Sequence, residues 1–126
     1  MKPSYEIQLA AAVAVAEAGG EANNRAIPAV IEVMRNRAEK HKTSLLAVVL
    51  KPMQFSCLNG VHDIPAFVAR YQQHPRYQDA LNCLTVVETD YAKGADHYCR
   101  VDCFPAWANG VEPTAIIGQH KFFTVP

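Results

Sequence analysis

A long uncharged segment that ends in a glutamate and two glycines constrains this chain more than any other feature. Residues 8–16 are alanine-rich and carry no charge, and the chain continues Glu17-Ala18-Gly19-Gly20. The apolar residues that share one face at helical spacing are Leu9, Ala12, Val13 and Ala16. Glu17 lies about 40° from Val13 on the same helical wheel. Because paired glycines commonly end a helix, we expect Glu17 in the last turn, at the margin of the buried stripe.

This position suits a carboxyl group that donates a proton. Partial desolvation and the negative end of the helix dipole both disfavour the ionised form of Glu17. A general acid that works near neutral pH must hold its proton until the substrate takes it. The other interpretation is a solvated glutamate in a last helical turn, and the local pattern leaves both open.

The rest of the chain predicts a mainly helical α+β domain. We expect a first helix capped by Ser4 and ending near Ala18, and a second that begins near Asn24. Three further helices are expected over 45–50, 64–71 and 75–94. A strand over 96–101 and, over 115–125, a hairpin around Gly118 or a final strand form a small β element towards the C-terminus.

Length and charge limit the class of protein. We expect residues 1–126 to form a single globular domain, because half of them are hydrophobic and 19% are charged. With 12 basic and 12 acidic residues the formal net charge is zero, which argues against a nucleic-acid partner. No window is apolar enough to span a membrane, and no signal-peptide pattern is visible. The four cysteines suit free thiols or two disulfides, and Cys99, Cys103 and His97 leave a zinc site open.

Six segments in order resemble the SleB/CwlJ-type cell wall hydrolases. They are Ala16-Glu17-Ala18-Gly19-Gly20-Glu21, Ala29-Val30 with Asn36-Arg37, Pro52-Met53-Gln54-Phe55-Ser56, His97-Tyr98, Pro105-Ala106-Trp107-Ala108 and Ile117-Gly118-Gln119-His120-Lys121-Phe122-Phe123. The resemblance covers nearly the whole chain. It departs from the family pattern at Phe123, where the family commonly has tyrosine, and in the two cysteines around Asp102.

The resemblance implies a lysozyme-like catalytic domain that acts on peptidoglycan without a cofactor or metal. Glu17 matches the family's catalytic glutamate. The family cuts the glycan between N-acetylmuramic acid and N-acetylglucosamine, and some members are lytic transglycosylases that leave a 1,6-anhydro end. A hydrolytic muramidase would need a second carboxylate, for which Glu21 and Asp63 are candidates. Both residues also have a structural interpretation: Glu21 can brace its loop, and Asp63 can stabilise a turn or cap a helix.

The matching segments also supply candidate substrate-binding residues. Gln54 and Ser56 carry groups that can hydrogen-bond an N-acetyl group or a sugar hydroxyl. Tyr98 and Trp107 have rings that can stack on a sugar face, although a lone tryptophan is more often a core residue. Two histidines, His97 and His120, match family positions and are candidate substrate-binding residues. Their structural interpretation is that of buried side chains whose ring nitrogens form hydrogen bonds within the protein.

Other functions remain open at this stage. A zinc-dependent amidase would need both histidines and a cysteine around one metal ion. A non-catalytic wall-binding module would hold glycan without turnover. For the enzyme we expect a monomer acting at the cell wall or in the periplasm. The absence of a visible signal peptide suits an endolysin released at phage lysis or a fragment of an exported protein.

Overall fold

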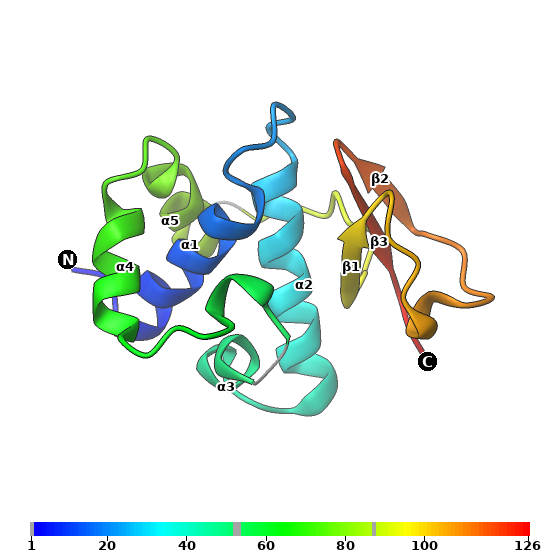
Figure 1. The fold of residues 1–126 in the computed structure, drawn as a ribbon, viewed down its shortest axis with the longest axis horizontal. Helices are drawn as coiled ribbons and strands as arrows, with labels where there is room; N and C mark the ends of the chain where they lie inside the picture. Colours follow the sequence, from blue (N-terminus) through cyan, green and yellow to red (C-terminus); the bar gives the residue numbers. More distant parts are fainter. Residues whose placement is uncertain (1, 52–53, 87) are drawn as a thin grey trace.

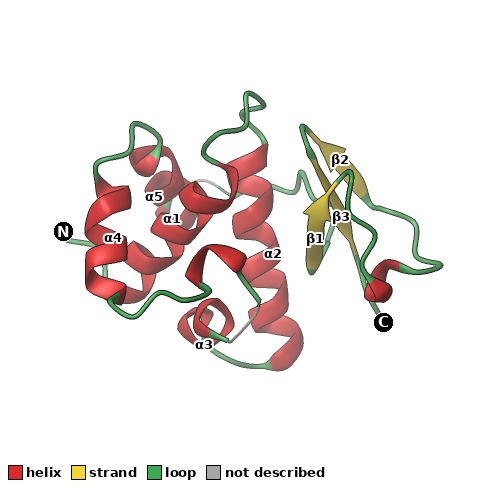
Figure 2. Ribbon diagram, in the orientation of Figure 1, coloured by secondary structure: helices red, strands yellow, loops and turns green. Residues whose placement is uncertain are grey.

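A group of helices and a small sheet lie on either side of one long helix, α2 (Figure 1). The computed structural model describes residues 2–51, 54–86 and 88–126. The α-helices are α1 (Tyr5–Ala18), α2 (Ala26–His41), α3 (Leu45–Leu50), α4 (Ile64–Gln72) and α5 (Tyr77–Thr85). Two short 3₁₀ helices, η1 (Ser56–Leu58) and η2 (Ala106–Ala108), lie in loops. Figure 2 shows the helical part and the sheet in separate colours. This is the predicted α+β class, so the fold prediction is confirmed.

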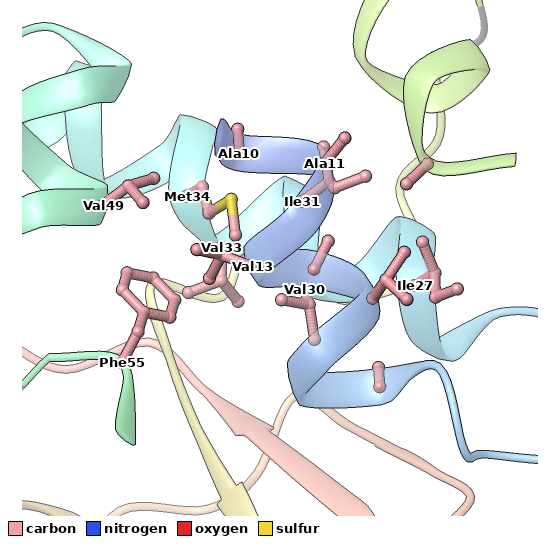
Figure 3. Packing of buried hydrophobic residues seen from close by; sticks show 14 of the residues in the cluster. Ala10, Ala11, Val13, Ile27, Val30, Ile31, Val33, Met34, Val49 and Phe55 are labelled. Carbon is pink, nitrogen blue, oxygen red and sulfur yellow. The ribbon is translucent and has the colours of Figure 1, made fainter. Parts of the chain in front are cut away.

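The uncharged segment forms the central helix of the molecule. Every residue from Leu9 to Val15 is buried, and α1 contacts α2, α3, α4 and α5. The sequence predicts one buried stripe, whereas the structure buries all faces, because helices pack around α1 on several sides. A helix that is apolar all round is typical of such a central position. Figure 3 shows Ala10, Ala11 and Val13 of α1 beside side chains of α2.

Both ends of α1 follow the prediction. Ser4 Oγ accepts a hydrogen bond from the Ile7 backbone N–H at 3.3 Å. The helix ends at Ala18, so Glu17 lies in its last turn. A Cβ atom at Gly19 would lie 2.4 Å from the Val15 carbonyl oxygen, which explains the glycine that follows the helix.

The predicted helix over 75–94 is wrong in its second half. The structure ends α5 at Thr85 and places Tyr91 in a loop. The cause is a contact with α2: the buried Glu32 carboxylate accepts a hydrogen bond from the Tyr91 backbone N–H at 3.1 Å. Val87 lies outside the described residues.

The sheet has three antiparallel strands in the order β1-β3-β2. They are β1 (His97–Arg100), β2 (Ala115–Ile117) and β3 (His120–Phe123). Gly118 turns the predicted hairpin with a φ of 58°, which glycine adopts at low cost.

Two neighbouring residues of α2 attach β1 to the helices. Asn36 Nδ2 donates to the Ala95 carbonyl at 2.9 Å, and Arg37 donates to the Asp96 carbonyl from Nε and Nη2. Arg37 is buried, and this burial lowers the pKa of its guanidinium. The Asn36-Arg37 pair therefore fixes where the first strand begins, immediately before Tyr98. In the described part of the chain, no helix is long and apolar enough to cross a membrane.

Candidate active site

Glu17 lines a cavity of about 370 Å³ between the end of α1, η1 and the sheet. Its described lining residues are Glu17, Gln54, Ser56, Tyr98, Cys99, Arg100, Cys103 and His120. Five of the predicted site residues therefore meet at one place, although they are spread over more than half of the chain. The carboxylate is half-buried, as its position at the margin of the helical core predicted.

The two oxygens of Glu17 have different surroundings. Oε1 accepts a hydrogen bond from the Tyr98 hydroxyl at 2.7 Å, an ordinary length for an O–H···O hydrogen bond. Oε2 lies 3.5 Å from Ser56 Oγ, at the outer limit of a hydrogen bond. Oε2 is therefore the oxygen that is available to exchange a proton with a ligand.

Tyr98 is a fixed hydrogen-bond donor. Burial, the charge of Glu17 and the hydrogen bond to Glu17 raise the pKa of its hydroxyl well above the usual value. Its ring lies against the core between Phe55 and Phe122, with centroid distances of 6.5 and 5.8 Å. The aromatic contacts hold the ring while the hydroxyl orients the carboxylate. We therefore interpret Tyr98 as a positioning residue.

Gln54 is held in place by a residue to which the sequence reasoning gave no role. Arg37 Nη1 donates to Gln54 Oε1 at 2.6 Å. Because this bond uses the side-chain carbonyl, the amide NH₂ group of Gln54 is the part left to donate to a ligand. The helical pattern predicts Arg37 on the outer face of α2 with Arg35, Glu39 and Lys40, and this is wrong for Arg37, which is buried and follows Val30 and Met34 at helical spacing.

The first candidate for a second carboxylate, Glu21, links two distant loops. Its Oε2 accepts a hydrogen bond from the Gln119 backbone N–H at 2.7 Å and lies 3.7 Å from His120 Nδ1. Its side chain is only 12% exposed. A Cβ atom at Gly118 would lie 1.8 Å from the same oxygen, so the hairpin turn closes directly onto the carboxylate. These contacts fit the brace interpretation.

The second candidate, Asp63, lies elsewhere. Its Oδ1 accepts a hydrogen bond from the Ala66 backbone N–H at 3.0 Å and caps α4. Asp63 is exposed and does not line the Glu17 cavity. Its contacts fit the cap interpretation.

The two histidines lie at opposite ends of the β1–β3 pairing. His120 pairs with Arg100 and lines the Glu17 cavity, whereas His97 pairs with Phe123 and lines another cavity. His97 Nδ1 lies 2.9 Å from Asp96 Oδ1. In the described residues no group of three or more His, Cys, Asp or Glu side chains could hold a metal ion. The zinc-amidase alternative therefore gains no geometric support.

Trp107 lies outside the Glu17 cavity. Its ring contacts His97 and Phe123, with centroid distances of 4.8 and 5.4 Å. Phe123, the departure from the family pattern, is itself buried in this contact. Trp107 as a sugar platform stays a prediction, and its visible role is to cover the outer face of the sheet.

All four cysteines are free thiols. Cys57 was not among the predicted site residues, yet burial and the charge of Glu17 raise the pKa of its thiol to about 12. Cys99 and Cys103 line the cavity itself.

Two solved structures share this fold. The catalytic domain of the germination-specific lytic transglycosylase SleB from Bacillus anthracis is 18% identical, with a TM-score of 0.76 over 98% of this chain and 97% of that chain. The catalytic domain of the SleB protein from Bacillus cereus is 22% identical, with a TM-score of 0.67 over 94% of this chain and 89% of that chain. No curated protein sequence matches the chain.

A family description confirms the predicted resemblance. The model of the Cell Wall Hydrolase family matches residues 21–123. Glu17 lies four positions before this segment, so its assignment rests on the motif and on the cavity that it lines. The prediction of an enzyme is confirmed by the same match. The chain belongs to the cell wall hydrolase family and has the fold of the SleB catalytic domains.

Proposed function

We propose that the whole chain acts as one catalytic domain, a lytic transglycosylase that cuts peptidoglycan between N-acetylmuramic acid and N-acetylglucosamine. The observation that carries the proposal is a single carboxylate, Glu17, among the described lining residues of its cavity, with Tyr98 donating to one of its oxygens. The choice of reaction is supported by the similar fold of the Bacillus anthracis SleB domain, which is a lytic transglycosylase.

In the first step Glu17 acts as the general acid. Its protonated Oε2 donates to the glycosidic oxygen, and the bond from that oxygen to C1 of the muramic residue breaks. The sugar ring becomes an oxocarbenium ion, and the carboxylate that Glu17 now carries stabilises this charge. The hydrogen bond from Tyr98 keeps the carboxylate in one orientation through the proton transfer.

In the second step the same group acts as the general base. Glu17 takes the proton of the C6 hydroxyl of the muramic residue, and O6 forms a bond to C1. The product is a 1,6-anhydromuramic end, Glu17 regains its proton, and no water is consumed. The step needs no second carboxylate, which agrees with the structural contacts of Glu21 and Asp63.

The other predicted site residues that line the Glu17 cavity would bind the sugar. Gln54 and Ser56 have groups able to donate to an N-acetyl carbonyl, and His120 lines the same cavity. We propose further that the enzyme acts as a monomer at the cell wall, with no nucleic-acid partner, as an endolysin or as part of an exported protein.

The alternative is a hydrolytic muramidase in which Glu21 or Asp63 activates water. A non-catalytic wall-binding module is a third possibility. Wild type, Glu17→Gln and the exposed control Glu39→Gln are each incubated with isolated peptidoglycan, and the products are identified by mass spectrometry. We expect anhydro-muropeptides from wild type and control and none from Glu17→Gln. Reducing ends would refute the proposed reaction, and turnover by Glu17→Gln would refute the role of Glu17.

A further inference from the structure

A second cavity, which we name the basic cavity, adjoins the Glu17 cavity. It has a volume of about 630 Å³ and lies between the end of α2, α3 and the start of β1. Five of its described lining residues carry basic side chains: Arg37, Lys40, His41, Lys51 and His97. No aspartate or glutamate is among its described lining residues. The Asp96 carboxylate lies 2.8 Å from Lys40 Nζ and 2.9 Å from His97 Nδ1 and offsets part of this charge. The attraction of the cavity for an anion therefore comes mainly from its other basic side chains.

The basic side chains differ in the hydrogen bonds and ion pairs that they form within the protein. Arg37 donates to the Asp96 carbonyl and to Gln54. Lys40 donates to Asp96 Oδ2 at 2.8 Å and to the Val125 carbonyl at 2.6 Å. His41 and Lys51 are exposed and form no ion pair within the described part of the chain. These last two are the groups that a ligand carboxylate can contact without displacing a protein partner.

The two cavities meet at one side chain. Gln54 lines both of them, and its hydrogen bond to Arg37 fixes it at the junction. A muramic residue placed at Glu17 for cleavage carries its stem peptide on the lactyl group at O3. The stem has a free carboxylate on its second residue when that residue is D-isoglutamate. With O3 of the muramic residue directed towards Gln54, its stem peptide would enter the basic cavity.

We propose that the basic cavity binds the carboxylates of the stem peptide attached to the muramic residue whose bond is cut. The inference rests on the proposed function for the placement of that residue at Glu17. It adds a substrate preference, because strands that keep their stems would bind more tightly than strands stripped of them. Lys51 and His41 would contribute most to the affinity for the stem carboxylates, since both side chains are exposed and line the cavity.

A binding experiment tests the inference without turnover. In the Glu17→Gln protein, the affinities of N-acetylmuramoyl-L-alanyl-D-isoglutamate and of its D-isoglutamine amide are measured by titration. We expect the free acid to bind about fivefold more tightly, the contribution of one partly exposed ion pair. Adding Lys51→Gln should remove this difference, and the exposed Lys2→Gln, which lines neither cavity, should keep it. Equal affinities, or a difference unaffected by Lys51→Gln, would overturn the proposal.

A kinetic comparison separates this inference from the proposed reaction. Wild type, His41→Gln, Lys51→Gln and Lys2→Gln are assayed on stem-bearing strands and on strands freed of stems by an amidase. The His41 and Lys51 substitutions should raise KM about fivefold more on stem-bearing than on stem-free strands. Equal effects on both substrates would refute stem recognition. Tighter binding of poly(glycerol phosphate) than of the stem would assign the cavity to teichoic acid instead. Reducing-end products would refute only the transglycosylase reaction, because the binding result does not depend on it.

Discussion

The contact between Gly118 and Glu21 can be tested by a double-mutant cycle. In Gly118→Ala the new methyl group meets Glu21 Oε2, since a Cβ atom there would lie 1.8 Å from it. The residue must also hold a φ of 58°, which costs an alanine about 1 kcal/mol. Moving the carboxylate breaks its hydrogen bond to the Gln119 N–H, which contributes about 1.5 kcal/mol. We therefore expect Gly118→Ala to lower the free energy of unfolding by about 2.5 kcal/mol.

The double variant gives the decisive value. Glu21→Ala alone should cost about 1.5 kcal/mol, because it removes the same hydrogen bond. Once the carboxylate is absent, the methyl group introduced by Gly118→Ala no longer meets that oxygen, and only the backbone cost is added. Gly118→Ala with Glu21→Ala should therefore cost about 2.5 kcal/mol in total, rather than the additive sum of about 4 kcal/mol.

The free energies are obtained from urea unfolding of the four proteins, with the slope m compared to confirm that the unfolded states are alike. A coupling energy near 1.5 kcal/mol would support the contact. Additive effects would show that the hairpin turn does not close onto Glu21 and would refute the reasoning. In that case the brace interpretation of Glu21 would lose its support.

Three further predictions concern the surroundings of the site. Tyr98→Phe removes the hydrogen-bond donor that orients Glu17. In a steady-state assay it should lower kcat about tenfold with little change in KM, and an unchanged kcat would contradict this role. Burial alone would raise the pKa of Asp96, but hydrogen bonds from Lys40, His97 and the Val125 backbone lower it to about 2. This pKa lies below the usual value of 3.8, so Asp96 stabilises the fold by about 2 kcal/mol above pH 4. That stability is lost as the pH falls towards 2. The difference in free energy of unfolding between wild type and Asp96→Asn, measured as a function of pH, should therefore fall towards zero between pH 4 and pH 2. Cys57, whose thiol has a pKa of about 12, should react with a thiol reagent at about pH 8 more than 100-fold more slowly than a free thiol; equal rates would contradict its burial.

The local sequence was sufficient to predict the element that carries Glu17. The bounds of α1 depend only on residues within or next to the helix: the uncharged segment, the Ser4 cap and the glycines after Ala18. The structure has the predicted ends. The hairpin at Gly118 is a similar case, because a positive φ is a property of the turn itself.

Features that depend on distant residues could not be predicted in the same way. Glu32 ends the fifth helix early by binding the Tyr91 backbone, and nothing near Tyr91 signals this. The Glu17–Tyr98 hydrogen bond joins residues 81 positions apart. The resemblance to a family predicted Tyr98 as a residue that stacks on a sugar. Only the folded structure shows that its hydroxyl donates a hydrogen bond to the Glu17 carboxylate.

In the proposed reaction one carboxylate, Glu17, completes the cleavage without water. It is tested most directly by digesting peptidoglycan in water enriched in ¹⁸O and examining the new muramic ends by mass spectrometry. The proposed reaction predicts 1,6-anhydro ends that carry no ¹⁸O, because O6 of the sugar closes onto C1. Reducing ends that carry ¹⁸O would show that water attacks C1, and would contradict the account of Glu17 as the sole acid and base.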